Sequence, residues 1–262
     1  MKVKLVKCSI AAPPSRLPGL DRAVNPYRGC AHSCSYCYAQ DVTRSETSSI
    51  WGSFVDVKVN VVQRLKKELE RCAKGVYGVG TVTDPYQPLE EKHELTRGCL
   101  SLLNRFGAKA SVLTKSDLVL RDIDLLAEME AVEIGLSVSC ANDRIAGIVE
   151  PGAPPPSARF DALSALADAG VDAYLMAAPV IPGVSDSRQS LTALIEAAAV
   201  AGVVRVVWDS WNPKPIASNR LKKALNDADM RLGSSTEEST FRVRSELSEL
   251  CGQKGMHLED AF

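Results

Sequence analysis

The sequence lacks the features that mark several broad classes of protein. No apolar run in its 262 residues approaches the length of a membrane span. The lysine-bearing segment 1–7 has no long hydrophobic region, so no secretory leader is predicted. No glycine-rich dinucleotide fingerprint is present, which disfavours a Rossmann nucleotide site. The formal net charge of −1 gives no global basic surface for nucleic acid, although a local patch stays compatible with it.

Cysteine is sparse, and its distribution is informative. Eight cysteines are few for a disulfide framework in a chain of this length, and free thiols with no leader predict a cytoplasmic protein. Three of them form the segment Cys30-Ala-His-Ser-Cys34-Ser-Tyr-Cys37, with no fourth cysteine nearby. Iron–sulfur sites that only carry electrons usually have four cysteines. The CxxxCxxC spacing therefore predicts a [4Fe–4S] cluster with one iron open to a small molecule. A structural zinc site is the alternative, but it needs a fourth ligand at regular spacing, and His32 lies inside the loop.

Strand-like and helix-like segments alternate after the cysteines, which predicts parallel strands joined by crossover helices. A short strand before Cys30 brings the number of strand–helix units to six. We expect an irregular lead-in over 1–23, an α/β barrel over 24–208 and a helical extension over 209–262 packed on it. The expected strands are 77–83, 109–114, 132–139, 172–180 and 203–208, and the expected helices are 57–72, 89–106, 118–130, 156–169 and 187–201.

Several further segments narrow the family. Asn25-Pro-Tyr-Arg-Gly-Cys30 and Cys37-Tyr38-Ala39 are followed in order by Thr83-Asp84-Pro85-Tyr86-Gln87-Pro88, Leu113-Thr114-Lys115, Arg121-Asp122, Glu150-Pro151 and Pro182-Gly183. The chain thereby resembles the radical S-adenosylmethionine (SAM) enzymes, in particular the group related to spore photoproduct lyase. The resemblance implies a partial (β/α)6 TIM-type barrel, with a [4Fe–4S] cluster on Cys30, Cys34 and Cys37.

The resemblance also implies a reaction. SAM binds the open iron and is cleaved reductively to a 5′-deoxyadenosyl radical, which abstracts a hydrogen atom from a substrate. It further implies an external electron donor of the flavodoxin or ferredoxin type and a monomeric protein. The substrate is unidentified: nucleic acid stays open, and a peptide or small metabolite is the alternative. A non-enzymatic zinc- or cluster-binding protein is the rival from another class.

Candidate SAM contacts follow the predicted strands. Thr83 and Asp84 come after the second strand, where polar side chains face a barrel mouth; capping of the next helix is the alternative. Lys115 ends an apolar strand, and the resemblance assigns it to the SAM carboxylate, which suits an ammonium group. An ordinary surface lysine is the other interpretation. Ser137 lies on the polar face of its strand and matches a SAM-contacting serine.

Other candidates depend more on the resemblance. It places Tyr36 against SAM, although a tyrosine beside a cluster also shields it from water. Arg159 could hold ribose or carboxylate oxygens, or form a structural salt bridge with Glu150. The segment containing Ile181 and Gly183 follows the fifth strand, where such barrels contact adenine; a plain Pro-Gly turn is equally compatible.

The catalytic candidates include one departure from the lyase. The resemblance places Tyr38 in a hydrogen-transfer relay. Thr81 stands where the lyase has its hydrogen-donor cysteine, and a threonine O–H is a far poorer hydrogen-atom donor, which puts photoproduct repair in doubt. Cys140 follows the fourth strand and could offer a thiol near the mouth, although a free cysteine more often packs as a small buried hydrophobe.

Overall fold

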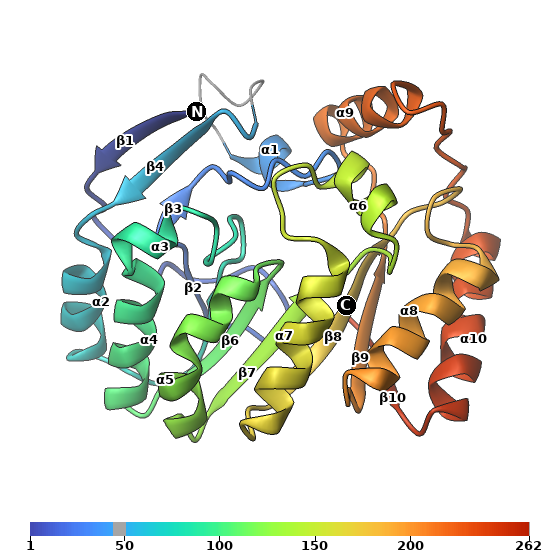
Figure 1. The fold of residues 1–262 in the computed structure, drawn as a ribbon. Helices are drawn as coiled ribbons and strands as arrows, with labels where there is room; N and C mark the ends of the chain where they lie inside the picture. The colour runs from blue at the N-terminus through green and yellow to red at the C-terminus, as the bar shows by residue number, and fades with distance from the viewer. Residues whose placement is uncertain (44–50, 262) are drawn as a thin grey trace.

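A parallel sheet organises the chain, whose residues 1–43 and 51–261 are described by a computed structural model. Within this part, seven strands are hydrogen-bonded in the order β10-β9-β8-β7-β6-β5-β2, and every neighbouring pair is parallel (Figure 1). The strands are β2 (Arg22–Val24), β5 (Val76–Val79), β6 (Lys109–Thr114), β7 (Val132–Ser137), β8 (Ala173–Val180), β9 (Arg205–Ser210) and β10 (His257–Asp260). The first six match the six predicted units. β10 was not predicted.

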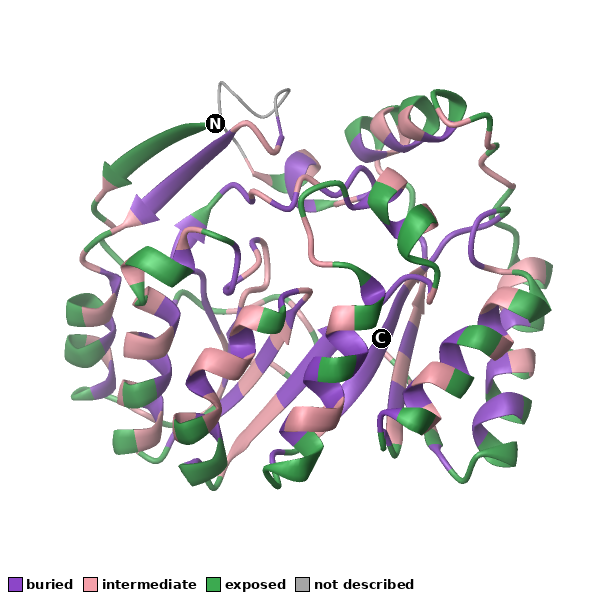
Figure 2. Ribbon diagram, in the orientation of Figure 1, coloured by how far each residue is buried: buried purple, intermediate pink, exposed green. Residues whose placement is uncertain are grey.

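Helices cover the outer face of this sheet. They are α2 (Val61–Leu69), α4 (Leu95–Arg105), α5 (Ile123–Glu128), α7 (Pro156–Asp168), α8 (Arg188–Val200) and α10 (Glu237–Gln253). Each buries one stripe, as Figure 2 shows; in α2 the stripe is Val61, Leu65 and Leu69, spaced four residues apart. These stripes pack with the outward side chains of the strands, such as Val112 and Leu136, into the main hydrophobic core. Burying such a side chain stabilises the fold by roughly 1.5–3 kcal/mol.

The opposite faces of the strands line the inside of the barrel. Along β8, Leu175 and Ala177 belong to the main core, whereas Tyr174, Met176 and Ala178 form a separate cluster on the other face. This alternation follows from the two-residue period of a strand. Register places Ser137 of β7 beside Met176, so Ser137 is directed into the barrel.

Three predicted helices differ from the structure. The helix expected over 57–72 is preceded by β4 (Phe54–Lys58), so helical residues begin only at Val61. The helix expected over 89–106 is divided into α3 (Glu90–His93) and α4, because Glu94 adopts a left-handed φ of 48°. The segment expected as a helix over 118–130 begins as a 3₁₀ turn over Asp117–Asp122 before α5.

A small second sheet leads to the three-cysteine segment. In it β1 (Lys2–Val6) runs parallel to β4, and β3 (Tyr27–Arg28) runs antiparallel to β4. The lead-in expected to be irregular therefore contains a strand. Gly29 follows β3 with a φ of +83°, and a Cβ there would lie 2.4 Å from the carbonyl oxygen of Phe54. Only glycine fits this close approach, which turns the chain into Cys30.

Three further helices lie at the rim of the barrel, next to the cysteine segment. They are α1 (Ala39–Val42), α6 (Asp143–Val149) and α9 (Pro215–Asn226), and α9 packs against both of the others (Figure 1). The expected helical extension over 209–262 thus contains α9 and α10 and also supplies β10 to the sheet. No helix in the described part of the chain is long and apolar enough to span a membrane.

Candidate functional site

The three cysteines of the loop between β3 and α1 are largely withdrawn from water. Cys30 and Cys34 are buried, Cys37 is partly buried, and all three are free thiols. Burial raises the pKa of Cys30 to about 12, and it also raises the pKa of Cys34 and of Cys37. Thiols in this state keep their protons until a metal replaces them. Three soft sulfur donors from one loop are the ligands that iron–sulfur clusters use.

The donor set fits a cluster at this loop. The thiols lie close enough that Cys37 affects the pKa of both Cys30 and Cys34. His32, the remaining metal-ligand type in the loop, is turned away: its Nδ1 lies 3.2 Å from Asp84 Oδ2. Among residues 1–43 and 51–261, no three His, Cys, Asp or Glu side chains are grouped to hold a single metal ion.

The segment 83–87 forms hydrogen bonds to the backbone of the cysteine loop. The hydroxyl of Thr83 donates to the carbonyl of Gly29 at 2.6 Å, and Gln87 Oε1 accepts from the N–H of Ala31 at 2.9 Å. Gln87 Nε2 also donates to Thr83 Oγ1 at 3.0 Å. Thr83 and Gln87 are both buried. Thr83, a predicted cofactor contact, therefore lies with its hydroxyl against the loop backbone.

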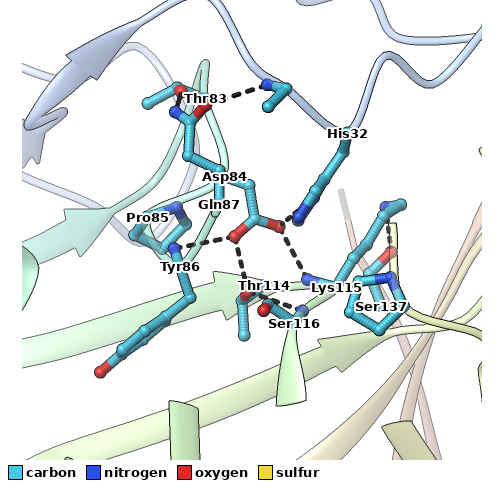
Figure 3. A network of polar contacts seen from close by, with 12 residues as sticks. His32, Thr83, Asp84, Pro85, Tyr86, Gln87, Thr114, Lys115, Ser116 and Ser137 are labelled. Carbon is cyan, nitrogen blue, oxygen red and sulfur yellow. Dashed lines mark hydrogen bonds and ion pairs between the residues drawn. The ribbon is translucent and has the colours of Figure 1, made fainter. Parts of the chain in front are cut away.

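Asp84 connects the loop to the end of β6, as Figure 3 shows. Its Oδ1 accepts from Thr114 Oγ1 at 2.6 Å and from the N–H of Tyr86 at 2.9 Å, and Oδ2 accepts from the N–H of Lys115 at 2.8 Å. Burial alone would raise the pKa of Asp84, but His32 and these hydrogen bonds outweigh it and lower the pKa to about 2. Asp84 therefore stays ionised, with both oxygens engaged by the protein.

Lys115 presents a cation to the same space. Its Nζ donates to Ser137 Oγ at 2.7 Å, and Ser137 donates in turn to the carbonyl of Ala178 at 3.0 Å (Figure 3). The ammonium lies 5.6 Å from the ring centroid of Tyr36, and its charge opposes the rise that burial causes in the pKa of Cys34. No carboxylate in the described residues forms an ion pair with it. A fixed, half-buried ammonium beside the cysteines is suited to bind an anion.

A buried polar group forms the wall next to Lys115. The hydroxyl of Tyr36 donates to Glu150, Ser139 donates to Glu150 Oε1 at 3.0 Å, and Arg159 forms an ion pair with the same carboxylate. Arg159 also donates to the carbonyl of Ser137 at 2.8 Å. Burial would raise the pKa of Glu150, but the charge of Arg159 outweighs it and the pKa is lowered. Of the two roles considered for Glu150 and Arg159, the structure contains the salt bridge.

The candidates after β8 occupy different surroundings. Ile181 is buried in a small apolar cluster together with Cys34 and Tyr36, so it lies at the site. Gly183 adopts a φ of +73°, and a Cβ there would lie 2.9 Å from the backbone nitrogen of Gly233. Gly183 thus forms a tight turn packed against the tail.

The two catalytic candidates are placed differently as well. The hydroxyl of Tyr38 donates to the carbonyl of Thr81, so the predicted relay tyrosine meets the position where the lyase has its donor cysteine. Thr81 Oγ1 accepts from Asn25 Nδ2 at 2.9 Å. Cys140 is buried, with its Sγ 3.6 Å from the carbonyl of Asn142. This contact joins residues only two positions apart, as expected of a cysteine that packs as a small buried side chain.

Sequence reasoning missed two groups at the site. Gln87 lies within the motif 83–88, but nothing in the sequence indicates its hydrogen bond to the backbone of the cysteine loop. Arg220 of α9 donates to Ser33 Oγ at 3.1 Å across a sequence separation of 187 residues. A contact of such long range leaves no periodicity or spacing to detect.

Comparison with known proteins decides the family. The model of the radical SAM superfamily matches residues 24–195. The chain belongs to the radical SAM superfamily. It is therefore a radical SAM enzyme whose cofactors are a [4Fe–4S] cluster and SAM, and the family, enzyme class and cofactors predicted from the sequence are confirmed.

Relatives of this radical SAM enzyme include proteins without an assigned function. An uncharacterized protein of Methanocaldococcus jannaschii is 35% identical over 187 residues, which cover 71% of each chain. An uncharacterized protein of Mycobacterium tuberculosis is 36% identical over 191 residues, covering 70% of this chain and 56% of the relative. A radical SAM Nα-GlyT isomerase of Pseudomonas phage M6 is 24% identical over 204 residues, covering 76% and 42%. The chain thus spans little more than half of the mycobacterial relative.

Solved structures confirm the predicted fold. Spore photoproduct lyase in complex with dinucleoside spore photoproduct superposes with a TM-score of 0.75 at 15% identity, covering 99% of this chain and 82% of the lyase. SuiB of Streptococcus suis bound to the precursor peptide SuiA gives a TM-score of 0.63 at 10% identity, covering 91% and 47%. At these identities the likeness establishes the partial (β/α)6 barrel and no more.

Proposed function

We propose that Cys30, Cys34 and Cys37 hold the [4Fe–4S] cluster, that SAM binds between this loop and Lys115, and that the enzyme abstracts a hydrogen atom from its substrate. The observation that carries this proposal is the ammonium of Lys115, which lies over the ring of Tyr36 near Cys34 and Cys37 and has no carboxylate partner in the described residues. When bound, the cluster supplies the electron that cleaves SAM reductively. An external flavodoxin- or ferredoxin-type protein delivers that electron in this proposal.

In this proposal the chain's own residues bind and orient SAM. Asp84 fixes the backbone of Lys115 through its N–H, and Ser137 fixes the ammonium end of the same side chain. The SAM carboxylate replaces the missing acidic partner of that ammonium in a charge-assisted contact. Tyr36 and Ile181 provide a buried wall that excludes water from the reacting groups.

Anaerobic reconstitution with iron and sulfide tests this function. We expect a brown protein with about four irons per chain that, after reduction, converts SAM to 5′-deoxyadenosine and methionine. Iron content and liquid chromatography of the products provide the measurement. A colourless protein that binds one zinc per chain and leaves SAM intact would contradict the proposal and favour the zinc-binding rival.

Replacing Lys115 by alanine should weaken SAM binding while the cluster absorbance is retained. A charge-assisted contact contributes roughly 1.5–3 kcal/mol, which corresponds to about a tenfold to hundredfold loss of affinity. The dissociation constant is measured by calorimetric titration of the reconstituted protein. Lys109→Ala is the matched control, because this exposed lysine begins the strand that Lys115 follows. Equal dissociation constants for Lys115→Ala and the control would remove Lys115 from the site.

The substrate is expected to differ from that of spore photoproduct lyase. Thr81, which meets Tyr38, offers an O–H in place of the lyase's thiol. The reduced enzyme with SAM should therefore restore essentially no thymine from an oligonucleotide containing the photoproduct, while 5′-deoxyadenosine still accumulates. Thymines restored per SAM consumed is the quantity to measure. Efficient repair that disappears in Cys140→Ala would overturn this expectation and identify Cys140 as the donor.

Solved structures of this fold contain ligands of two classes. The lyase structure contains a dinucleoside spore photoproduct, and the SuiB structure contains a precursor peptide. These are the two classes to test as substrates of this enzyme.

A further inference from the structure

Helix α9 of the C-terminal tail is attached to the cysteine loop at its N-terminus. The backbone N–H groups of Ile216 and Ala217 donate to Oδ1 and Oδ2 of Asp41 at 2.8 and 3.0 Å. Asp41 belongs to α1, which begins two residues after Cys37. The carboxylate satisfies two N–H groups that a helix start leaves unpaired, and it also faces the positive end of the helix dipole. The start of α9 is therefore fixed to the residues that follow Cys37.

Arg220, one turn further along α9, contacts the loop itself. One amino group donates to Gln40 Oε1 at 3.0 Å, and the other donates to Ser33 Oγ at 3.1 Å and to the Ser33 carbonyl at 3.3 Å. Ser33 stands between Cys30 and Cys34 with a left-handed φ of 56°. Such a conformation is uncommon for a residue with a side chain and is retained where its surroundings hold it.

The apolar side of α9 also packs against the cysteine loop. Leu221 and Leu225 are fully buried in one cluster with Cys34 and Tyr36, and Cys37 packs at its edge. The tail thus covers the cysteine loop with apolar side chains that follow Arg220 in α9. The guanidinium is held against the loop by packing as well as by hydrogen bonds.

The charge of Arg220 has no acidic partner in the described part of the chain. Arg121 and Arg159, also removed from water, each form ion pairs with carboxylates. Arg220 is half-buried, and its recorded acceptors are neutral. A desolvated cation without a counter-charge is costly. Arg220 contacts Ser33, the residue before Cys34, and its helix packs against Cys34 and Cys37, whose thiols become thiolates when they ligate iron.

We infer that Arg220 is a positioning residue that both holds the cluster loop and compensates the negative charge of the ligated cluster, which makes the cluster easier to reduce. The inference rests on the proposed ligation by Cys30, Cys34 and Cys37. Net charge and hydrogen bonds around the sulfurs are among the factors that set the reduction potential of an iron–sulfur cluster. A fixed cation on the tail is therefore part of the reduction step, although it lies far from the motif in sequence.

The test compares Arg220→Gln with Lys222→Gln in the reconstituted protein. Both variants remove one positive charge from α9, but Lys222 is exposed to solvent. An EPR-monitored redox titration measures the fraction of reduced cluster. At a fixed potential we expect Arg220→Gln to lower the ratio of reduced to oxidised cluster about tenfold, a shift of about 59 mV for one electron. Lys222→Gln should titrate like the wild type.

Arg220→Lys separates charge from geometry. It should keep the wild-type potential, because the charge is retained, but it should release iron to a chelator faster, because a lysine cannot reproduce the three contacts of the guanidinium fork. Equal potentials for Arg220→Gln and Lys222→Gln would overturn the inference. A wild-type protein that assembles no cluster would instead refute the proposed function, so the two failures are distinguishable.

Discussion

Cys34→Ala should lose both the iron–sulfur absorbance and the cleavage of SAM, and Cys30→Ala and Cys37→Ala should behave alike. In the proposed ligation each thiolate binds one iron of the cluster, and no fourth cysteine stands in the loop to replace a lost ligand. The measurements are the visible absorbance after anaerobic reconstitution and the yield of 5′-deoxyadenosine. We expect the product to fall below detection.

Cys72→Ala is the matched control for the cysteine variants. Cys72 is an exposed free thiol after α2, so its removal should change neither absorbance nor SAM cleavage. A triple variant of Cys30, Cys34 and Cys37 that still bound iron stoichiometrically and cleaved SAM would show that the ligands are elsewhere.

The second large effect is expected from Arg159→Met. This change leaves the carboxylate of Glu150, which is almost completely buried, without its ionic partner. Removing one partner of a buried ion pair typically costs about 3–5 kcal/mol, because the remaining charge is uncompensated in a medium of low polarity. The free energy of unfolding from urea titration of the cluster-free protein should fall by that amount.

Two further variants make this prediction specific. Arg188→Met removes a partner from the exposed pair Arg188–Glu249 and should leave the free energy of unfolding essentially unchanged, because water screens an exposed ion pair. The double variant Glu150→Gln/Arg159→Met should be more stable than Arg159→Met alone, because no unpaired charge is left. A loss for Arg159→Met no larger than that for Arg188→Met would mean that Glu150 and Arg159 do not depend on each other for stability.

The barrel strands were predictable where burial alternates along the chain. The strand over 109–114 was predicted with its observed bounds, because Ala110, Val112 and Thr114 are buried and their neighbours are less so. β10 was missed because the sequence His257-Leu-Glu-Asp260 has no run of apolar residues and pairs only at the edge of the sheet. Its formation depends on the neighbouring strand β9, and a single sequence does not reveal that pairing.

Part of the site was predictable as well. The sequence placed Lys115 and Ser137 at the ends of barrel strands, and the structure brings the two side chains together. Their part in binding SAM, like the ligation by the three cysteines, stays a prediction. The hydrogen bonds of Thr83 and Asp84 to other parts of the protein could not be predicted. In the sequence, a hydroxyl or carboxylate at a strand end looks the same whether it faces a ligand or a backbone group. Arg220 had no signal, because its contact depends on how the tail returns over the barrel rim.

The contact between Ser33 and Arg220 also bears on the order in which the enzyme is made. At about 5–20 residues per second, roughly 10–40 s pass between the synthesis of the two residues, which are 187 positions apart. During that interval the nascent chain already carries the three cysteines but has no α9 to cover them. The contacts between α9 and the loop form only after Arg220 has left the ribosome. A cluster inserted before then would enter a loop that α9 does not yet cover.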